Sequence, residues 1–187
     1  MVLAGFKVNL PNLLGAGRLF SAPFVAVFAL KGNFEAAFWV FTLAGITDAI
    51  DGPLARRFKT VDTLGFYLDP AADKILINTA YVTLAFLGLV PIWLAGFVFL
   101  RDFLIAFTFT VSPLLKINLR IAPIPLSKTN TGLQIGLAAL VLAKSAFALE
   151  IASVVEGFVW VVAATTLASG VNYVLKWARH GGEQAGV

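Results

Sequence analysis

The chain is divided by its hydropathy into six apolar runs, each close to the length of a membrane-spanning helix. The runs cover residues 11–30, 34–57, 69–89, 92–115, 131–147 and 154–177. A helix that crosses a bilayer needs about 20 apolar residues. Only 13% of the residues are charged, whereas a soluble domain carries roughly 25%. We therefore predict an all-α integral membrane protein with six transmembrane helices, an N-terminal interfacial segment and a single domain over residues 1–187.

Short polar segments mark where the runs begin and end. Residues 31–33 (Lys-Gly-Asn) and 90–91 (Val-Pro) are turn signals, and residues 116–128 form a polar loop that contains proline. Asp69-Pro70 marks the start of the third helix, because proline is common in a first helical turn, although this boundary could lie a turn earlier.

The basic residues are distributed unequally between the two ends of the predicted helices. Six helices place both termini on one side, and eleven of the fourteen Lys and Arg residues lie on that side. They are Lys7, Arg18, Arg56, Arg57, Lys59, Lys74, Lys116, Arg120, Lys128, Lys176 and Arg179. Lys31 and Lys144 lie on the other side, and Arg101 lies inside a span. Since cytoplasmic loops carry the excess of Lys and Arg, we expect both termini in the cytoplasm.

Composition and the N-terminus narrow the function classes further. There is no cysteine, which excludes disulfides and thiolate metal sites. The net charge of +4 occurs without a basic run interleaved with aromatic residues, so we expect no nucleic-acid partner. The first ten residues do not resemble a cleaved signal or transit peptide. The simplest location is therefore a bacterial cytoplasmic (inner) membrane.

Four aspartates lie at helical spacing in one stretch of this apolar chain. Asp48 and Asp51 are three residues apart, which places them on one face of a helix, and Asp69 and Asp73 are four apart on the next. Two antiparallel neighbouring helices could therefore direct all four carboxylates to one point. Asp48 precedes Lys59 by 11 residues, about 16 Å of helix, so it should lie within the membrane near the cytoplasmic face.

Carboxylates at that depth need a compensating charge. Each costs roughly 2.5–3.5 kcal/mol in the centre of a membrane helix, and four would also repel one another. Oxygen ligands in this number suit Mg²⁺ or Mn²⁺, or alternatively Ca²⁺. The motif thus predicts a metal site for phosphate chemistry.

Two alternatives remain for the aspartates. They could form buried ion pairs with Arg56, Arg57 and Lys74. They could also belong to a metal- or proton-coupled transporter, which would spread ionisable residues across the membrane in a repeated arrangement. Their position near one face favours a one-sided catalytic pocket.

The complete motif resembles the signature of the CDP-alcohol phosphatidyltransferases. It reads D-x2-D-G-x2-A-R-x8-G-x3-D-x3-D from Asp48 to Asp73, and the resemblance extends from Pro11 to about Gln134. It implies a membrane enzyme of six helices that releases CMP from a CDP-linked lipid when an alcohol attacks. It also implies a homodimer.

The resemblance assigns roles to individual residues. Asp48, Asp51, Asp69 and Asp73 would hold the divalent metals, and Asp73 would also be the catalytic base toward the acceptor hydroxyl. The CDP-lipid-binding residues would be Asn12, Arg18, Gly52, Ala55, Arg56 and Gly65. Gly15 stands where the family's entry segment has threonine.

The acceptor alcohol depends on residues outside the motif. Arg101-Asp102 and the segment from Ser127 to Gln134 resemble the CMP-forming cardiolipin synthases, whose acceptor is phosphatidylglycerol and whose donor is CDP-diacylglycerol. Phosphatidylglycerophosphate synthases, which use glycerol 3-phosphate, more often have a lysine where Asn130 stands. These synthases remain the alternative, and enzymes that use serine or inositol as acceptor rank behind them. Arg101 and Lys128 are the candidate ligands of the acceptor phosphate.

Replacing the predicted base tests this assignment. Asp73→Asn should abolish turnover but retain metal-dependent binding of the CDP-lipid, because the amide cannot accept the hydroxyl proton. Turnover is measured as CMP release, and binding as retention of labelled CDP-lipid on the purified protein. Near-normal CMP release would remove Asp73 from the role of base.

Overall fold

The computed structural model is a bundle of six α-helices, without a strand in the residues it describes, which are 10–58, 63–114 and 125–184. Side chains are described for residues 17–47, 74–107 and 126–175. The helices are α1 (Leu10–Leu30), α2 (Phe34–Phe58), α3 (Thr63–Phe86), α4 (Ile92–Leu114), α5 (Pro125–Ala146) and α6 (Ala152–Gln184). The prediction of an all-helical fold is confirmed, and the predicted interfacial segment falls on residues outside the described part.

Three predicted boundaries differ from the structure, and they are the starts of α3 and α5 and the end of α6, which continues past Trp177 to Gln184. Helix α3 begins at Thr63, before Asp69-Pro70, because the apolar residues 64–68 extend the helix ahead of the proline. Helix α5 begins at Pro125, so Lys128 lies in its first turn and not in a loop. The polar residues that suggested a loop there include side chains that face the bundle interior, such as the fully buried Asn130.

Three helices end in the same turn geometry. The second residue after the helix has a positive φ at Gly32 (75°), Gly88 (71°) and Ala148 (50°). In each turn the next amide donates to a carbonyl five residues earlier: Asn33 to Phe28 (2.9 Å), Leu89 to Leu84 (2.9 Å) and Leu149 to Lys144 (3.1 Å). This is the Schellman motif, which normally takes glycine in the left-handed position. Ala148 is therefore strained.

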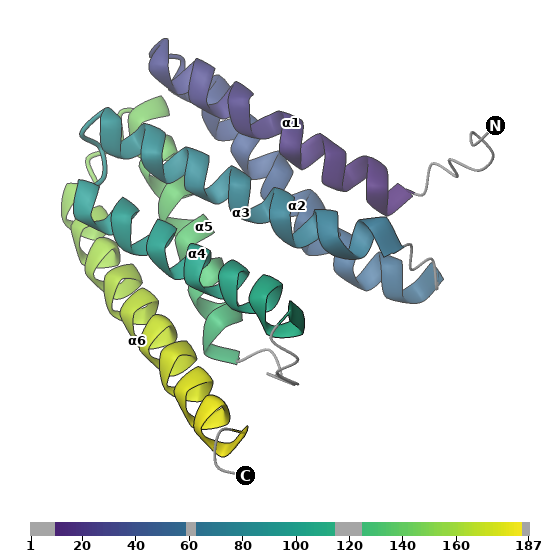
Figure 1. Ribbon diagram of the computed structural model, residues 1–187. Helices are drawn as coiled ribbons and strands as arrows, with labels where there is room; N and C mark the ends of the chain where they lie inside the picture. The colour runs from purple at the N-terminus through teal and green to yellow at the C-terminus, as the bar shows by residue number, and fades with distance from the viewer. Residues whose placement is uncertain (1–9, 59–62, 115–124, 185–187) are drawn as a thin grey trace.

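The helices form a bundle in which α5 packs against three others (Figure 1). Helix α1 lies across α2 and α3, while α5 contacts α2, α3 and α6, and α4 contacts α3 and α6. The loops after α1, α3 and α5 lie at one end of the bundle (Figure 1), with Lys31 and Lys144 beside two of them. The C-terminal part of α2 and the start of α3, which carry the aspartate motif, lie toward the other end.

The interior contains many small side chains, and large apolar side chains cover the outside. Ala22, Ala29, Ala37, Ala44 and Ala80 are buried where helices meet. Large exposed residues include Phe20, Phe24, Phe86, Ile92 and Trp160, each 54–80% exposed. Small residues at helix contacts and apolar surfaces of this extent are typical of helices packed within lipid.

Length and apolar character identify one helix able to cross a membrane within the described residues. This is Ala152–Leu175, 24 residues long. Shorter apolar segments occur at Gly17–Leu30, Phe34–Thr47 and Lys74–Phe86. The prediction of six transmembrane spans thus stays a prediction.

The turn geometry can be tested at two positions with opposite expectations. Gly88→Ala should lower the free energy of unfolding by about 1 kcal/mol, because its φ is positive. Ala148→Gly should not lower it, since relief of backbone strain offsets the greater freedom of the unfolded chain. Thermal unfolding in detergent is the measurement, with Gly96→Ala inside α4 as a control that should be neutral or stabilising. A destabilising Ala148→Gly would contradict the strain assigned to this turn.

Candidate functional site

The helices bring the two halves of the aspartate motif to neighbouring helix ends. Asp48 and Asp51 lie on α2 within its last three turns, and Asp69 and Asp73 lie on α3 within its first three. The chain returns from Phe58 to Thr63. Gly52, Ala55 and Arg56 are also on α2, Gly65 is on α3, and Asn12 is on α1. The side chains of these residues lie outside the described part, so their roles stay predictions.

Arg18 borders a cavity beside the motif. The cavity, about 310 Å³, lies between α1 and α2, and it is lined in part by Arg18, Ser21, Ala44 and Thr47. Arg18 is only 2% exposed, and Thr47 immediately precedes Asp48. A buried guanidinium in a cavity that Thr47 also lines would fit an anionic group. Nothing further tests the predicted contact of Arg18 with the CDP-lipid.

A buried cluster of charges lies on the other side of α3, centred on Asp102. Arg101 Nη1 donates to Asp102 Oδ1 at 2.6 Å, and Lys74 Nζ donates to the same oxygen at 2.7 Å. Asn78 Nδ2 donates to Oδ2 at 3.2 Å. The side chains of Arg101 and Asp102 are 3% and 5% exposed. Because Lys74 directly follows Asp73, this cluster begins one residue from the motif.

The Arg101 guanidinium also joins α4 to α5 and α6. Nη2 donates to Ser127 Oγ at 2.6 Å and to the Ser127 carbonyl at 3.3 Å. Nε and Nη2 donate to Ser169 Oγ at 3.4 and 3.2 Å. An acceptor phosphate could therefore reach Arg101 only by replacing or joining these partners. Its predicted role in acceptor binding stays a prediction.

The pair between Arg101 and Asp102 is closer than the sequence suggested. Adjacent residues on a helix point in different directions, so the sequence alone does not predict this pair. The arginine side chain is long enough to turn back to its neighbour, and Lys74 approaches Asp102 from α3. Lys128, the second candidate for the acceptor phosphate, is exposed on α5 next to Ser127.

A second polar group lies within the contact of α5 and α6. Asn130 and Gln134 are fully buried one turn apart on α5. Thr165 and Thr166 donate to Asn130 Oδ1 at 2.8 and 3.0 Å, and Gln134 Nε2 donates to Thr166 at 3.2 Å. The Tyr81 hydroxyl of α3 donates to the Gln134 carbonyl at 3.0 Å. This group fixes the contact of three helices.

Several residues of these clusters were not predicted from the sequence. They are Asn78, Tyr81, Thr165, Thr166 and Ser169, with Lys74 considered only as a partner of the motif. Polar residues inside apolar runs were the available signal, because such residues usually face the interior of a helix bundle.

These observations together define a class of protein. It is a helical bundle with an apolar exterior, buried charges, and a motif of four aspartates beside them. A family model described as CDP-alcohol phosphatidyltransferase matches residues 8–170. The chain therefore belongs to the CDP-alcohol phosphatidyltransferase family, and the predicted resemblance is confirmed.

Individual relatives include enzymes with two different acceptors. The chain is 36% identical over 182 residues to the cardiolipin synthase (CMP-forming) of Homo sapiens, covering 88% of this chain and 60% of the relative. It is 29% identical over 184 residues to the probable cardiolipin synthase (CMP-forming) of Drosophila melanogaster, covering 90% of this chain and 57% of the relative. It is 32% identical over 171 residues to the CDP-diacylglycerol–glycerol-3-phosphate 3-phosphatidyltransferase of Rickettsia bellii, covering 88% of this chain and 93% of the relative.

The chain therefore spans less than two thirds of the length of these two cardiolipin synthases. The relatives establish a phospholipid phosphatidyltransferase family, and they do not decide between the two acceptors.

Removing the shared carboxylate tests the energetic role of the buried cluster. Asp102→Asn should lower the free energy of unfolding by about 3 kcal/mol, because it leaves two neighbouring cations without their anion. The double substitution Arg101→Met/Asp102→Asn should recover part of this loss, since it also removes the buried guanidinium. Thermal unfolding in detergent measures both variants.

Glu156→Gln is the matched control for Asp102→Asn, because Glu156 is an exposed carboxylate on α6. It should remain within about 0.5 kcal/mol of the unsubstituted chain. If Asp102→Asn were equally neutral, the ion pairs would contribute nothing to folding.

Proposed function

We propose that this chain transfers a phosphatidyl group from CDP-diacylglycerol to phosphatidylglycerol, giving cardiolipin and CMP. The observation that carries the proposal is the complete aspartate motif within a chain whose family model covers residues 8–170. Membership of a transferase family argues against the transporter alternative. The 36% identity to a CMP-forming cardiolipin synthase, together with Arg101-Asp102 and Ser127–Gln134, supports phosphatidylglycerol as acceptor.

The proposed reaction needs one displacement at phosphorus. The acceptor hydroxyl oxygen attacks the phosphorus that carries the diacylglycerol group, and the bond from that phosphorus to the CMP oxygen breaks. Asp73 accepts the hydroxyl proton as general base. CMP leaves with the electron pair of the broken bond, so no covalent enzyme intermediate is needed. Arg18 and Arg56 would hold the phosphates of the donor.

The candidate metal ligands fit one kind of cofactor, a hard divalent cation. All candidate ligands on α2 and α3 are carboxylates, which suit Mg²⁺ or Mn²⁺. Asp48, Asp51, Asp69 and Asp73 would hold two such ions. Bound there, the metal would neutralise the diphosphate and polarise the phosphorus under attack.

The membrane arrangement is also part of the proposal. We infer six membrane spans in a bacterial cytoplasmic membrane, with the aspartate motif near the cytoplasmic face and two chains forming a homodimer. The exposed Phe20, Phe86, Ile92 and Trp160 support contact with lipid over several helices. The excess of Lys and Arg on the side of the motif supports the orientation.

Glycerol 3-phosphate is the second candidate acceptor. The Rickettsia bellii relative, whose name specifies glycerol 3-phosphate, is matched over 93% of its length. The phosphate of glycerol 3-phosphate is dianionic and would favour additional cations in the acceptor site, whereas phosphatidylglycerol carries one negative charge. Asn130 stands where a lysine is more frequent in enzymes that use glycerol 3-phosphate, and this less basic acceptor site favours phosphatidylglycerol.

Acceptor competition tests the proposal. Purified full-length chain in detergent receives CDP-diacylglycerol, Mg²⁺ or Mn²⁺, and either phosphatidylglycerol or glycerol 3-phosphate. We expect CMP release with phosphatidylglycerol, and loss of release when the metal is chelated. Asp48→Asn is the inactive control, since it removes a proposed metal ligand. Release with glycerol 3-phosphate alone would show that the acceptor assignment is wrong, and no release with any alcohol would remove the transferase assignment.

A further inference from the structure

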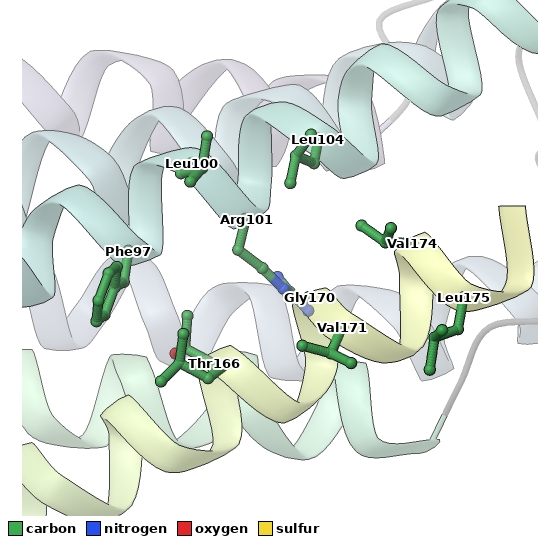
Figure 2. Close-up of a pocket in the computed structure, with 10 residues that line it drawn as sticks. Phe97, Leu100, Arg101, Leu104, Thr166, Gly170, Val171, Val174 and Leu175 are labelled. Atoms are coloured by element: carbon green, nitrogen blue, oxygen red, sulfur yellow. The ribbon is translucent and has the colours of Figure 1, made fainter. Parts of the chain in front are cut away.

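A groove with apolar walls lies between α4 and α6, on a different face from the cavity beside Arg18. Its volume is about 310 Å³, within the range of roughly 300–1,000 Å³ found for ligand pockets. Figure 2 shows Phe97, Leu100 and Leu104 of α4 facing Val171, Val174 and Leu175 of α6 across it. Leu100, Val171, Val174 and Leu175 are 49–57% exposed, so the groove opens to the outer surface.

The groove exists because α6 carries a glycine where α4 carries its buried arginine. Gly170 lies opposite Arg101, whose side chain extends from α4 toward it (Figure 2). A Cβ at Gly170 would lie 4.0 Å from Arg101 Cγ, an ordinary contact. A Cβ at position 170 is therefore accommodated without displacing Arg101, and the further atoms of a larger side chain would extend beside the groove that Gly170 lines.

The inner wall of the groove leads to charged groups. The Arg101 stem borders the groove, and its guanidinium contacts Ser127, Ser169 and Asp102 behind it. Asp102 binds Lys74, the residue after Asp73. Arg101, Lys74 and Asp102 together carry one net positive charge. An anionic amphiphile whose chain fills the groove would bring its phosphate toward this net positive cluster, where the phosphate would join or replace the present partners of Arg101.

We propose that this groove binds one acyl chain of an anionic phospholipid, the acceptor in the reaction proposed above. This inference rests on the proposed function for the identity of the lipid. It explains how a lipid acceptor could approach the aspartate motif from the α4–α6 side, along the path of Arg101, Asp102 and Lys74. A soluble acceptor such as glycerol 3-phosphate would have no use for the groove.

The size of the groove favours a chain over a protein partner. One turn of an α-helix with its side chains, about 10 Å across and 5.4 Å long, occupies roughly 420 Å³, which is more than the 310 Å³ of the groove. A second copy could insert single side chains only. An extended hydrocarbon chain fits both the shape and the apolar walls.

A matched pair of substitutions on α6 tests the groove. Gly170→Leu places an isobutyl group in it, whereas Gly157→Leu adds the same group to an exposed site of the helix, where a Cβ meets nothing within 4 Å. Leucine favours the helix at both positions, so folding should be retained. Circular dichroism and thermal unfolding in detergent confirm this.

The first measurement is photolabelling of the purified full-length chain by phosphatidylglycerol with a photoreactive group at the end of an acyl chain. Mass spectrometry should find the label on groove residues such as Leu104 and Val174, competed by unlabelled phosphatidylglycerol. Gly170→Leu should lose this labelling, and Gly157→Leu should keep it. Label spread equally over all exposed apolar faces in both variants would overturn the proposal in favour of bulk lipid contact.

The second measurement is CMP release with long-chain and short-chain phosphatidylglycerol. Gly170→Leu should raise KM for the long-chain acceptor by about tenfold, leave KM for the short-chain acceptor unchanged, and leave KM for CDP-diacylglycerol unchanged.

Three outcomes would contradict one of the two proposals. Equal effects on both chain lengths, or no effect, would refute the groove as an acyl-chain site while the proposed function stands. Groove labelling in an enzyme that uses glycerol 3-phosphate alone would instead refute the proposed acceptor and leave the lipid site standing. Disulfide bonds between two copies carrying Val171→Cys, without lipid labelling, would overturn the groove as a lipid site.

Discussion

The described part of the bundle depends on one buried carboxylate shared by two cations. Asp102 binds Arg101 and Lys74 at 2.6 and 2.7 Å, and Arg101 extends the contacts to Ser127 and Ser169. These contacts connect α3, α4, α5 and α6. Each partner needs the others, because an unpaired charge in an apolar interior costs more than the pair itself contributes. The cluster therefore fixes the relative positions of four helices next to the aspartate motif.

The distribution of apolar residues agrees with this dependence on polar contacts. Apolar side chains that face lipid gain little from moving inward, so helices in a membrane are held by close packing and hydrogen bonds. Buried alanines allow the close packing, and the Asn130–Thr165–Thr166–Gln134 group supplies hydrogen bonds between α5 and α6. Large side chains such as Phe20 and Phe86 remain outside.

The sequence predicted six helices and most of their ends, because apolar runs and glycine-containing turns are local signals. The prediction from the sequence failed where polar side chains face the interior of the bundle. The start of α5 was mistaken for a loop, since Ser127 and Asn130 look like solvent-exposed residues until their partners on α4 and α6 are known. The same limit applies to Asp102, whose contact with Lys74 joins residues 28 positions apart. The motif aspartates were found readily because their spacing is local, and their side chains lie outside the described part.

The buried position of Asn130 changes how acceptor choice should be understood. Asn130 has no exposed surface, and its Oδ1 accepts hydrogen bonds from both Thr165 and Thr166. A residue so enclosed cannot touch an acceptor directly. A lysine there would lose the accepting oxygen and place an ammonium between α5 and α6, which would have to move to admit it. Ser127 lies three residues earlier on α5 and holds Arg101, which borders the groove. Selection at position 130 would therefore act through helix packing, by changing where Ser127 places the guanidinium.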